Sequence, residues 1–226
     1  MPKAGLTRQL VLDAALDYVD AHGLPQLTMR KLGAHLGVEG MALYRHVPNK
    51  AALLDGLVDR VIETAFAGLR EPAPGRDDAW VAWMREFAHG LRAALLAHPG
   101  VLPLTATRPV SSPDALRMSE RWLAVMRAAG LPLGRAMDIV NVLATFTIGH
   151  TLAEAGSTPG HEEPAPDLDT ADLDPVEFPN LAEVVATRAG LDFGSRFAQA
   201  VDILLDGYVR AGTGSATPAP PDPTAG

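Results

Sequence analysis

Apolar residues recur at intervals of three and four along most of this 226-residue chain. Between residues 7 and 22, for example, Leu10, Val11, Ala14 and Tyr18 fall on one side of a helix with about 3.6 residues per turn. Alternating runs rich in β-branched residues, which would indicate strands, are absent from the sequence. The pattern predicts an all-α fold.

Capping residues and helix breakers divide the first part of the chain into three short helices and a long one. Thr7, Thr28 and Asn49 have side chains that accept hydrogen bonds from the free N–H groups at a helix start, and Gly23 and Gly37 suit the turn at a helix end. The predicted helices span residues 7–22, 29–36, about 41–46 and 50 to about 69.

A segment with Pro and Gly, residues 70–78, separates these helices from a second region. There we predict helices over residues 80–98, 113–130, about 135–155, about 180–189 and 192–211, with an irregular stretch at 103–109. Residues 157–178 hold seven acidic residues, four prolines and no Lys or Arg, which indicates a loop. The expected division is a first domain over 1–50, a connecting helix over 51–69, a second domain over 70–211 and a disordered tail over 212–226.

The composition excludes several classes of protein. Because the chain has no cysteine, it has no disulfide framework, thiolate metal site or cysteine nucleophile, and a reducing compartment is indicated. No run reaches the roughly 18 uninterrupted apolar residues of a membrane helix. The apolar run after Arg8 breaks at Asp13, too soon for a signal peptide. These features predict a cytoplasmic protein with no membrane partner.

The net charge of −8 is unevenly distributed. Residues 1–60 contain seven Lys and Arg against six Asp and Glu, a balance of +1, whereas residues 61–226 contain 12 against 21, a balance of −9. Within residues 28–50, Arg30, Lys31, Arg45 and Lys50 oppose the single acid Glu39. The negative net charge alone argues against binding to nucleic acid. A small basic face on an otherwise acidic protein nevertheless permits nucleic acid to bind at that face.

Residues 29–46 have the layout of a helix-turn-helix, with two short helices joined by a turn of about four residues that contains Gly37. The first helix is expected to pack through Leu32 and Leu36, and the second docks on it through Val38 and Leu43. The second helix then presents Glu39, Gly40, Met41, Ala42, Tyr44, Arg45 and His46 outward.

Such an outward face suits the major groove of DNA, where base edges are read by the start of the second helix. Arg45 can donate twice to a guanine, Met41 can lie against a thymine methyl group, and Tyr44 can donate to a phosphate. Lys50 suits another phosphate, because the free N–H groups at a helix start attract anions. The alternative is a surface helix pair with basic ends, in which Tyr44 is a core aromatic.

The segment LTMRKLGAHLGVEGMALYRHVPNKAALLDGL resembles the DNA-binding region of the tetracycline-repressor (TetR) family of bacterial transcriptional regulators. TRP at residues 107–109, FTIGHTLAEAG at 146–156 and FGSRFAQAVDILLDGYVRAG at 193–212 resemble the ligand-binding and dimerisation domain of the tetracycline-repressor branch. The resemblance implies a homodimer that binds a palindromic double-stranded DNA operator, represses transcription and is released by a small-molecule effector. It places the DNA contacts on Thr28, Arg30, Gly40, Met41, Ala42, Tyr44, Arg45, His46 and Lys50.

The second helix departs from that branch at its start. Gly40 and Met41 stand where the tetracycline repressor has Gln and Pro, so the operator is expected to differ. Because Gly40 brings no side chain to a base, sequence readout is expected to depend on Arg30, Arg45 and DNA shape.

Helix-turn-helix proteins bind two half-sites about 34 Å apart, which requires a second copy of the chain. The resemblance assigns the dimer interface to the helices that contain residues 138–155 and 193–210. Two apolar stripes are predicted to form a four-helix seam between subunits: Phe193, Phe197, Val201 and Leu204, and Ile139, Val142, Leu143 and Phe146. Packing of both stripes within one subunit is the alternative.

Residues 80–137 hold all three tryptophans and four of the seven methionines. Rigid indoles with adaptable thioethers suit a pocket for an apolar or aromatic molecule, and they suit a core equally well. Thr107, Arg108 and His150 are polar groups that can orient a ligand. The predicted ligand contacts are Trp83, Met84, Phe87, Leu91, Leu104, Thr107, Arg108, Met126 and His150.

The tetracycline repressor, which this chain resembles, holds magnesium with a histidine before the TRP segment and its drug with an asparagine on the preceding helix. Leu104 and Phe87 occupy those positions here. Neither side chain can ligate a hard cation, which prefers oxygen or imidazole. We therefore expect a metal-independent, more apolar effector, with no metal site and no cofactor.

Two other classes of protein compete with a regulator. An enzyme would need a catalytic motif, but the chain has no nucleophile elbow or phosphate loop, and His161 and Glu162 lack the second histidine of a metalloprotease. A helical adaptor that binds other proteins would use the same Met and Trp residues. Binding to a palindromic duplex, with salt-dependent affinity, distinguishes a regulator from an adaptor.

Overall fold

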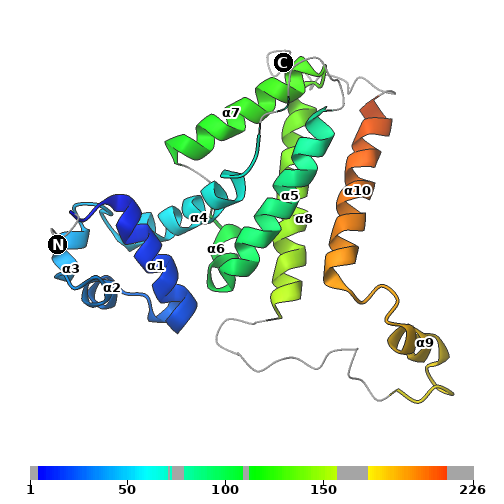
Figure 1. Ribbon diagram of the computed structural model, residues 1–226, viewed down its shortest axis with the longest axis horizontal. Helices are drawn as coiled ribbons and strands as arrows, with labels where there is room; N and C mark the ends of the chain where they lie inside the picture. Colours follow the sequence, from blue (N-terminus) through cyan, green and yellow to red (C-terminus); the bar gives the residue numbers. More distant parts are fainter. Residues whose placement is uncertain (1–4, 71, 73–78, 109–111, 157–172, 213–226) are drawn as a thin grey trace, which may run out of the picture.

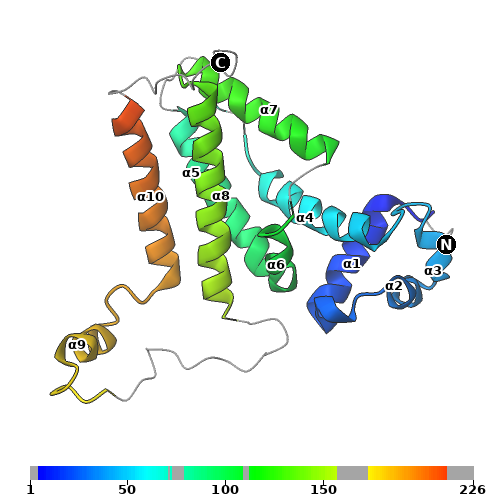
Figure 2. The same ribbon diagram turned by 180° about the vertical axis from the view of Figure 1, so that it is seen from behind.

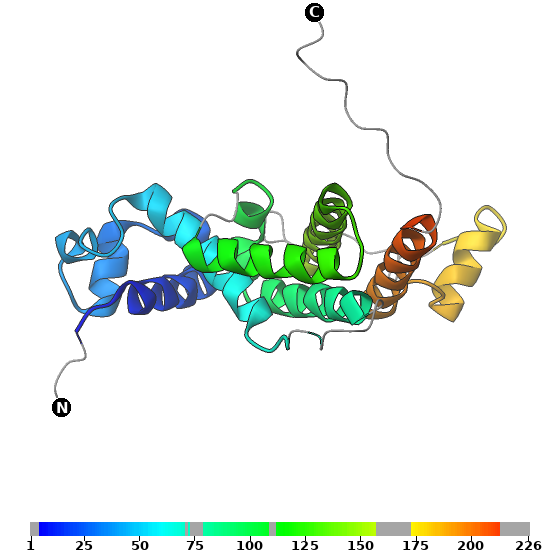
Figure 3. The same ribbon diagram turned by 90° about the horizontal axis from the view of Figure 1, so that it is seen from above.

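The computed structural model describes residues 5–70, 72, 79–108, 112–156 and 173–212. Within these ranges the chain forms ten α-helices and two short 3₁₀ helices and no strand, which confirms the predicted all-α fold. Most of the predicted link at 70–78 and loop at 157–178, and the predicted tail beyond residue 212, lie outside the described residues. The molecule is elongated, with α1, α2 and α3 at one end and α9 at the other (Figure 1 and Figure 3).

The first two helices begin at the predicted caps. α1 (Arg8–His22) starts where the Thr7 hydroxyl accepts a hydrogen bond from the backbone N–H three residues on, at 3.1 Å. α2 (Met29–Leu36) starts in the same way at Thr28, at 3.2 Å. It ends at Gly37, whose φ of 68° lies in the left-handed region that favours glycine.

The next helix is shorter than predicted. α3 (Gly40–Leu43) begins one residue earlier than the expected start at 41, but its regular part ends at Leu43 rather than at 46. The chain continues through a turn in which the N–H groups of His46 and Val47 both donate to the Leu43 carbonyl, at 2.9 Å each. α3 and this turn together occupy the predicted second helix of the pair.

α4 (Lys50–Phe66) leads from the first three helices into the body of the molecule (Figure 1). The predicted cap is present, because the Asn49 side chain accepts a hydrogen bond from the N–H of Ala52 at 2.8 Å. The helix ends at Phe66, a few residues before the predicted end near 69. It packs against α1 on one side of the junction and most extensively against α5 (Ala79–Ala97) on the other.

The body is a bundle of helices. α5 and α8 (Leu133–Ala155) run side by side through its centre, and α10 (Phe193–Gly212) lies along them (Figure 2). α7 (Pro113–Ala128) packs against α4 and α8. α9 (Pro179–Thr187) has no buried residue and stands apart from the bundle in both views.

The stretch predicted to be irregular, residues 103–109, contains one turn of helix. α6 (Leu102–Thr105) follows the 3₁₀ turn Pro99–Val101. Pro103 lies in the first turn of α6, where a backbone N–H would have no partner within the helix, so proline does not prevent helix formation there. The prediction failed because a proline can begin a helix as well as end one.

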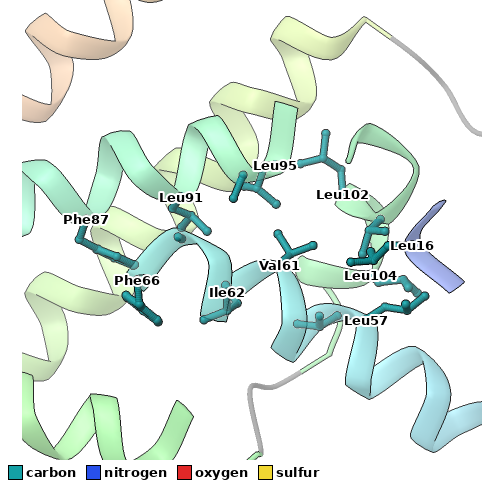
Figure 4. Packing of buried hydrophobic residues seen from close by; sticks show 14 of the residues in the cluster. Leu16, Leu57, Val61, Ile62, Phe66, Phe87, Leu91, Leu95, Leu102 and Leu104 are labelled. Carbon is teal, nitrogen blue, oxygen red and sulfur yellow. The ribbon is translucent and has the colours of Figure 1, made fainter. Parts of the chain in front are cut away.

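One apolar core continues from the first helices into the body. Figure 4 shows Leu16 of α1 near Leu57 of α4 and Leu104 of α6. At the same junction Gly100 lies so close to α1 that a Cβ atom added to it would be 2.8 Å from the Val19 side chain. The first three helices are therefore packed onto the body as well as linked to it by α4.

The two apolar stripes predicted for a dimer seam are used mainly inside the subunit. Phe197, Val201, Ile139 and Leu143 have 0% exposure, so the prediction that they meet a second subunit is wrong. An amphipathic stripe first covers the core of its own chain, and periodicity alone does not separate the two uses. The same helices do expose apolar residues: Met137, Leu152 and Val142 on α8, of which Val142 belongs to the predicted stripe, and Ile203 and Val209 on α10.

By length and composition alone, α8 is a helix that could cross a membrane, with a mean hydropathy of 1.2 over an 18-residue window. The criterion of about 18 uninterrupted apolar residues does not identify α8, because polar residues such as Asn141 interrupt its sequence. Within the fold α8 contacts α5, α6, α7 and α10. Packing against these neighbours buries 28% of that window.

Candidate functional site

α2 and α3 meet at two glycines. A Cβ atom on Gly33 would lie 2.8 Å from the Gly40 nitrogen and 2.9 Å from the Val38 carbonyl oxygen. The Val38 N–H also donates to the Gly33 carbonyl at 2.9 Å. The two helix backbones are therefore in direct contact, which holds α3 in a fixed orientation on α2.

The buried residues of this pair determine which face of α3 lies outside. Leu32 and Leu43 are completely buried, which confirms the predicted docking surface. In contrast, Met41 is 74% and Tyr44 is 41% exposed, and Arg45 is exposed as well. The alternative in which Tyr44 is a core residue is therefore excluded.

The expectation that Gly40 faces outward is wrong. A Cβ atom added to it would point at α2, 3.2 Å from the Met29 carbonyl oxygen. Ala42 and His46 are only partly exposed. Gly40 is thus a packing residue of α3, and only its backbone remains available to a partner.

The flanks of the pair carry exposed polar and cationic groups. Arg30, Arg45 and Lys50 are exposed, and no carboxylate of the described chain pairs with them. Thr28 is also exposed; its oxygen accepts the capping hydrogen bond, which leaves the hydroxyl hydrogen free to donate. Lys50 is the first residue of α4, where unpaired backbone N–H groups add to its positive charge.

Four aromatic rings meet where α4, α5 and α7 converge, and we call Phe66, Trp83, Phe87 and Trp122 the aromatic cluster. Trp122 contacts each of the others, with ring centroids 4.6 Å from Phe66, 4.6 Å from Phe87 and 6.3 Å from Trp83. Phe66 stacks on Phe87 at 5.2 Å. The structure therefore brings two of the predicted ligand contacts, Trp83 and Phe87, together with two rings from α4 and α7.

Both indole nitrogens of the aromatic cluster lack a partner. Trp83 and Trp122 are only 4% and 3% exposed, yet neither Nε1 has an acceptor within the described residues. A buried donor without an acceptor costs about 1–3 kcal/mol. Buried polar groups are normally paired, so these two mark an unusual place in the core.

The remaining apolar residues predicted to contact a ligand lie in the core. Met84, Leu91 and Met126 have 0% exposure. Leu104 lies beside Leu57, at the opposite end of Figure 4 from the Phe66 and Phe87 rings. Leu104 therefore belongs to the junction between α1, α4 and α6.

His150 lies in a second group of rings, between α8 and α10. Its ring centroid is 5.2 Å from Phe197, 5.5 Å from Phe193 and 5.6 Å from Phe146. The side chain is 11% exposed, and neither ring nitrogen has a hydrogen-bond partner in the part of the chain that the structure describes. Burial lowers the pKa of His150 below its ordinary range, although the Glu154 carboxylate 3.9 Å away opposes the change.

Thr107 and Arg108 follow α6 at the junction between the first helices and the body. The Arg108 guanidinium pairs with the Asp55 carboxylate of α4. The Thr107 hydroxyl donates to the Pro103 carbonyl at 3.0 Å. The contacts of these two predicted ligand groups are thus with their own chain, and Arg108 ties the segment after α6 to α4.

Other polar contacts at this junction were not predicted. Arg60 of α4 pairs with Asp13 of α1 at 2.6 Å, and the Nδ1 atom of His98 lies 2.7 Å from the Asp20 carboxylate. The partners are 47 and 78 positions apart in the chain. No local spacing connects residues so distant, so only the fold reveals these contacts.

A polar cleft of about 420 Å³ opens beside the junction, lined by Arg8, Ala52, Asp55, Asp59, Glu63, Ser112 and Pro113. Its charged lining does not match the apolar pocket expected for the effector. Among the described residues, no group of three or more His, Asp or Glu side chains has an arrangement that could hold a metal ion.

Comparison with known protein families gives matches over both parts of the chain. The family described as "Bacterial regulatory proteins, tetR family" matches residues 11–57. The family described as "Tetracyclin repressor-like, C-terminal domain" matches residues 71–210, which is more than half of the chain.

Individual relatives agree with the family matches. The chain is 34% identical over 148 residues to the HTH-type transcriptional repressor DrrR1 of Streptomyces coeruleorubidus, covering 66% of this chain and 53% of that protein. It is 31% identical over 201 residues to the tetracycline repressor protein class A from transposon 1721 of Escherichia coli, covering 88% and 89%. The chain thus spans about half of DrrR1 and most of the class A repressor.

A solved structure shows the same fold. The crystal structure of the Streptomyces coelicolor TetR family protein ActR in complex with actinorhodin is similar with a TM-score of 0.74 and 30% identity, covering 94% of this chain and 100% of that one. With the helix pair and the all-α body described above, these matches show that the chain belongs to the TetR family of bacterial regulators, whose members are non-enzymatic, soluble DNA-binding proteins.

Proposed function

We propose that this chain is a ligand-responsive transcriptional repressor of the bacterial cytoplasm. It binds a palindromic DNA operator as a homodimer and leaves the operator when a small apolar or aromatic effector binds. The exposed face of α3 and its turn, with Met41, Tyr44 and Arg45 on a helix fixed by backbone contact, is the observation that carries the proposal. The repressors named above support the DNA-binding part, and the complex of ActR with actinorhodin supports the effector part.

The proposed division of labour follows the order of the chain. Residues 1–50 read DNA, residues 51–69 connect, and residues 70–211 bind the effector and the second subunit. The basic charges of residues 28–50 support this assignment, because phosphates repel the acidic remainder.

The DNA contacts are proposed with a role for each group. Arg45 donates to a guanine edge, Met41 packs against a base, and Tyr44 donates to a phosphate. Lys50 and Thr28 bind backbone phosphates from the starts of α4 and α2. Arg30 and His46 supply further contacts, while Ala42 is small and Gly40 contributes only its backbone.

The effector is proposed to enter the body at the aromatic cluster, whose members Trp83 and Phe87 are the best supported of the predicted contacts. Met84, Leu91 and Met126 form the apolar surroundings. Three of the predicted contacts lie instead at the junction between the first helices and the body: Leu104, Thr107 and Arg108. They are proposed to transmit the structural change caused by effector binding to the DNA-binding helices. His150 lines a separate part of the body.

Release of DNA is proposed to be a shift between two populations of the dimer with different spacings of the DNA-reading ends. An effector moves such an equilibrium only by its difference in affinity for the two states. Moving from mostly bound to mostly free operator needs about 5 kcal/mol. α4 is the proposed lever, because it contacts α1 through Arg60 and the segment after α6 through Asp55.

Duplex selection followed by gel shift tests the DNA-binding part. We expect the full chain to enrich a palindrome from random duplexes, and to bind it with an affinity that falls steeply as salt rises. Arg45→Ala and Tyr44→Ala should abolish the shift while sedimentation still shows a dimer. Arg127→Ala, which removes an exposed positive charge from α7, is the matched control and should bind as wild type does. A strictly monomeric chain that enriches no duplex would refute the proposal.

Calorimetry with tetracycline tests the metal-independence of the effector. Leu104 and Phe87 offer no oxygen or imidazole to a magnesium ion, so we expect no tight magnesium-dependent binding of tetracycline. Titration with and without magnesium distinguishes the cases. Tight binding that requires the metal would overturn this part of the proposal.

A further inference from the structure

The aromatic cluster contains two buried hydrogen-bond donors that none of the described residues satisfies. We infer that the effector is a planar aromatic molecule with a neutral acceptor oxygen, such as a ring carbonyl, which accepts hydrogen bonds from the indole N–H groups of Trp83 and Trp122. The inference rests on the proposed function, because it names the chemical class of the effector proposed there.

The two indole rings that carry these donors are neighbours. Trp83 and Trp122 come from α5 and α7, and their rings are 6.3 Å apart and almost perpendicular, at 89°. Both side chains are more than nine-tenths buried, and both Nε1 atoms are unpaired. An indole nitrogen only donates, so an acceptor is the one group that satisfies it. A carbonyl oxygen has two lone pairs, which allows one such atom to serve both donors.

A single water molecule would not resolve this arrangement. Buried waters typically make about three hydrogen bonds, and they donate as well as accept. Around the two indoles the contacting rings of Phe66 and Phe87 offer no oxygen or nitrogen to a water proton. A ligand atom that accepts without donating fits better, since it leaves no proton of its own unpaired.

The surroundings favour a flat, neutral molecule. Phe66 and Phe87 stack at 15°, and the tilted Trp122 ring packs against both, so a planar ring system can replace or extend these contacts. The cation–π contacts of the described residues involve Phe193, Phe197 and Tyr208 instead. Without a cation at these rings, a carboxylate would be costly to bury, whereas a carbonyl is not.

The position of the aromatic cluster connects the bound molecule to α4. Phe66 is the last residue of α4, and its ring contacts both Phe87 and Trp122. A molecule that separates the indoles must therefore displace the end of the helix that reaches α1. The hydrogen bonds to the acceptor oxygen thus determine which ligand binds, and they also hold that ligand against the end of α4.

A matched pair of probes tests the acceptor directly. 9-Fluorenone and fluorene are planar and of similar size, and fluorenone carries a carbonyl where fluorene has a methylene group. Thermal unfolding of the full chain followed by circular dichroism, at increasing probe concentration, gives the affinity of each. We expect fluorenone to bind about tenfold or more tightly than fluorene, as a gained hydrogen bond predicts. In the double variant Trp83→Phe with Trp122→Phe the preference should fall to about unity.

Trp80→Phe is the matched control. Trp80 lies on α5 and is as buried as Trp83, at 4% exposure, but its indole nitrogen is not among the unpaired buried atoms. This variant should keep the preference for fluorenone. The chain has three tryptophans, so the three indole N–H signals in a ¹⁵N spectrum can be assigned from these variants. Fluorenone should move the signals of Trp83 and Trp122 and leave that of Trp80.

The single variants Trp83→Phe and Trp122→Phe, and the wild-type probe comparison, keep the test decisive if the double variant does not fold. Equal affinity for the two probes, no binding of either, or a preference that survives both substitutions would each overturn the inference. Gel shift with the selected duplex is measured on the same proteins. If the duplex is bound but the two probes bind equally, the inference about the acceptor oxygen is refuted and the proposed regulatory function is not. If no duplex is bound, the proposed function itself is refuted.

Discussion

At Gly33 a missing carbon atom allows α2 to touch α3. The atoms that a Cβ would meet at 2.8 and 2.9 Å are backbone atoms of Gly40 and Val38, which cannot move aside as the end of a flexible side chain can. α3 has little more than one turn of its own, so its orientation depends on this contact. The contact of Gly33 with Gly40 therefore determines the exposure of Tyr44 and Arg45, although neither glycine has a side chain that could contact DNA.

Gly33→Ala is expected to destabilise the protein and to weaken DNA binding. Forcing an extra carbon into a closely packed contact costs about 1–3 kcal/mol. Thermal unfolding by circular dichroism and gel shift with the selected duplex measure the two effects. Gly134→Ala is the control, because a Cβ atom there would meet nothing within 4 Å. A Gly33→Ala protein that unfolds like wild type would show that α2 and α3 are not held by this contact.

His150 is expected to make stability depend on pH. Burial lowers the pKa of His150 in the folded protein, with a smaller opposing effect of Glu154 and further lowering by Arg196 and Arg92. The unfolded chain has the ordinary value of about 6.5, so below that pH unfolding takes up a proton and the free energy of unfolding falls. Above it the histidine is neutral in both states and has no such effect.

His150→Leu removes this titration. Melting temperatures from pH 8 to about pH 5, a window on either side of the ordinary histidine pKa, should fall more steeply for wild type than for the variant. Parallel curves for the two proteins would mean that the ring is protonated as easily in the folded state as in the unfolded state.

Among the helices, α4 has contacts with every part that the proposed mechanism connects. It meets α1 through Arg60 and Asp13, the segment after α6 through Asp55 and Arg108, and the aromatic cluster through Phe66. A displacement at one end of a continuous helix is carried to the other end. Among the described residues, the ion pair of Arg108 with Asp55 joins α4 to the segment between α6 and α7, together with the hydrogen bond from the Ser112 N–H to the Asp59 carboxylate at 3.3 Å.

Arg108→Gln is expected to separate effector binding from DNA release. An effector found by thermal-shift screening should stabilise the variant as it does wild type, because Arg108 pairs with α4. The concentration of effector that displaces the duplex should rise several-fold, since part of the coupling free energy is lost. Arg127→Gln serves as the control. Unchanged release by the Arg108 variant would remove this ion pair from the mechanism.

The helices that could be predicted are those whose ends depend on neighbouring residues. Thr7, Thr28, Asn49 and Ser112 all cap helices, because each needs only a backbone N–H three residues on. α6 was missed because a proline at a helix start has the same sequence signature as a helix breaker.

Contacts between distant residues could be predicted only in part. Trp83 and Phe87 were recognised as candidates for ligand binding, but their assembly with Phe66 and Trp122 depends on three helices meeting. The burial of Ile139 and Phe197 within the subunit was given only as the alternative to a dimer seam, for the same reason. Periodicity identifies an apolar face but not its partner.

At the scale of the whole molecule, α8 and α10 leave apolar side chains uncovered. Met137, Val142 and Leu152 on α8 are 37–45% exposed, and Ile203 and Val209 on α10 are 60% and 44% exposed. Apolar patches on a soluble protein commonly mark an interface. These residues replace the buried stripes as the proposed seam of the homodimer.

Ile203→Glu is expected to dissociate the dimer, because a charge in an apolar interface loses its hydration without gaining a partner. Sedimentation velocity should show a helical monomer, and binding to the full palindrome should be lost. Leu116→Glu places the same charge on α7 at a residue of similar exposure, 57% against 60%, and should leave the dimer intact. A dimer that persists in Ile203→Glu would place the interface elsewhere.

The apolar core that runs from α1 into α4 and α6 also limits how such regulators can be recombined. Leu16, Leu57 and Leu104 belong to one core, and Val19 touches the turn at Gly100. A chimera that takes its DNA-reading segment from a relative would place foreign side chains against this surface. Exchange at residue 50 would therefore yield a poorly folded hybrid, unless the α1 residues that face the body were kept from the recipient.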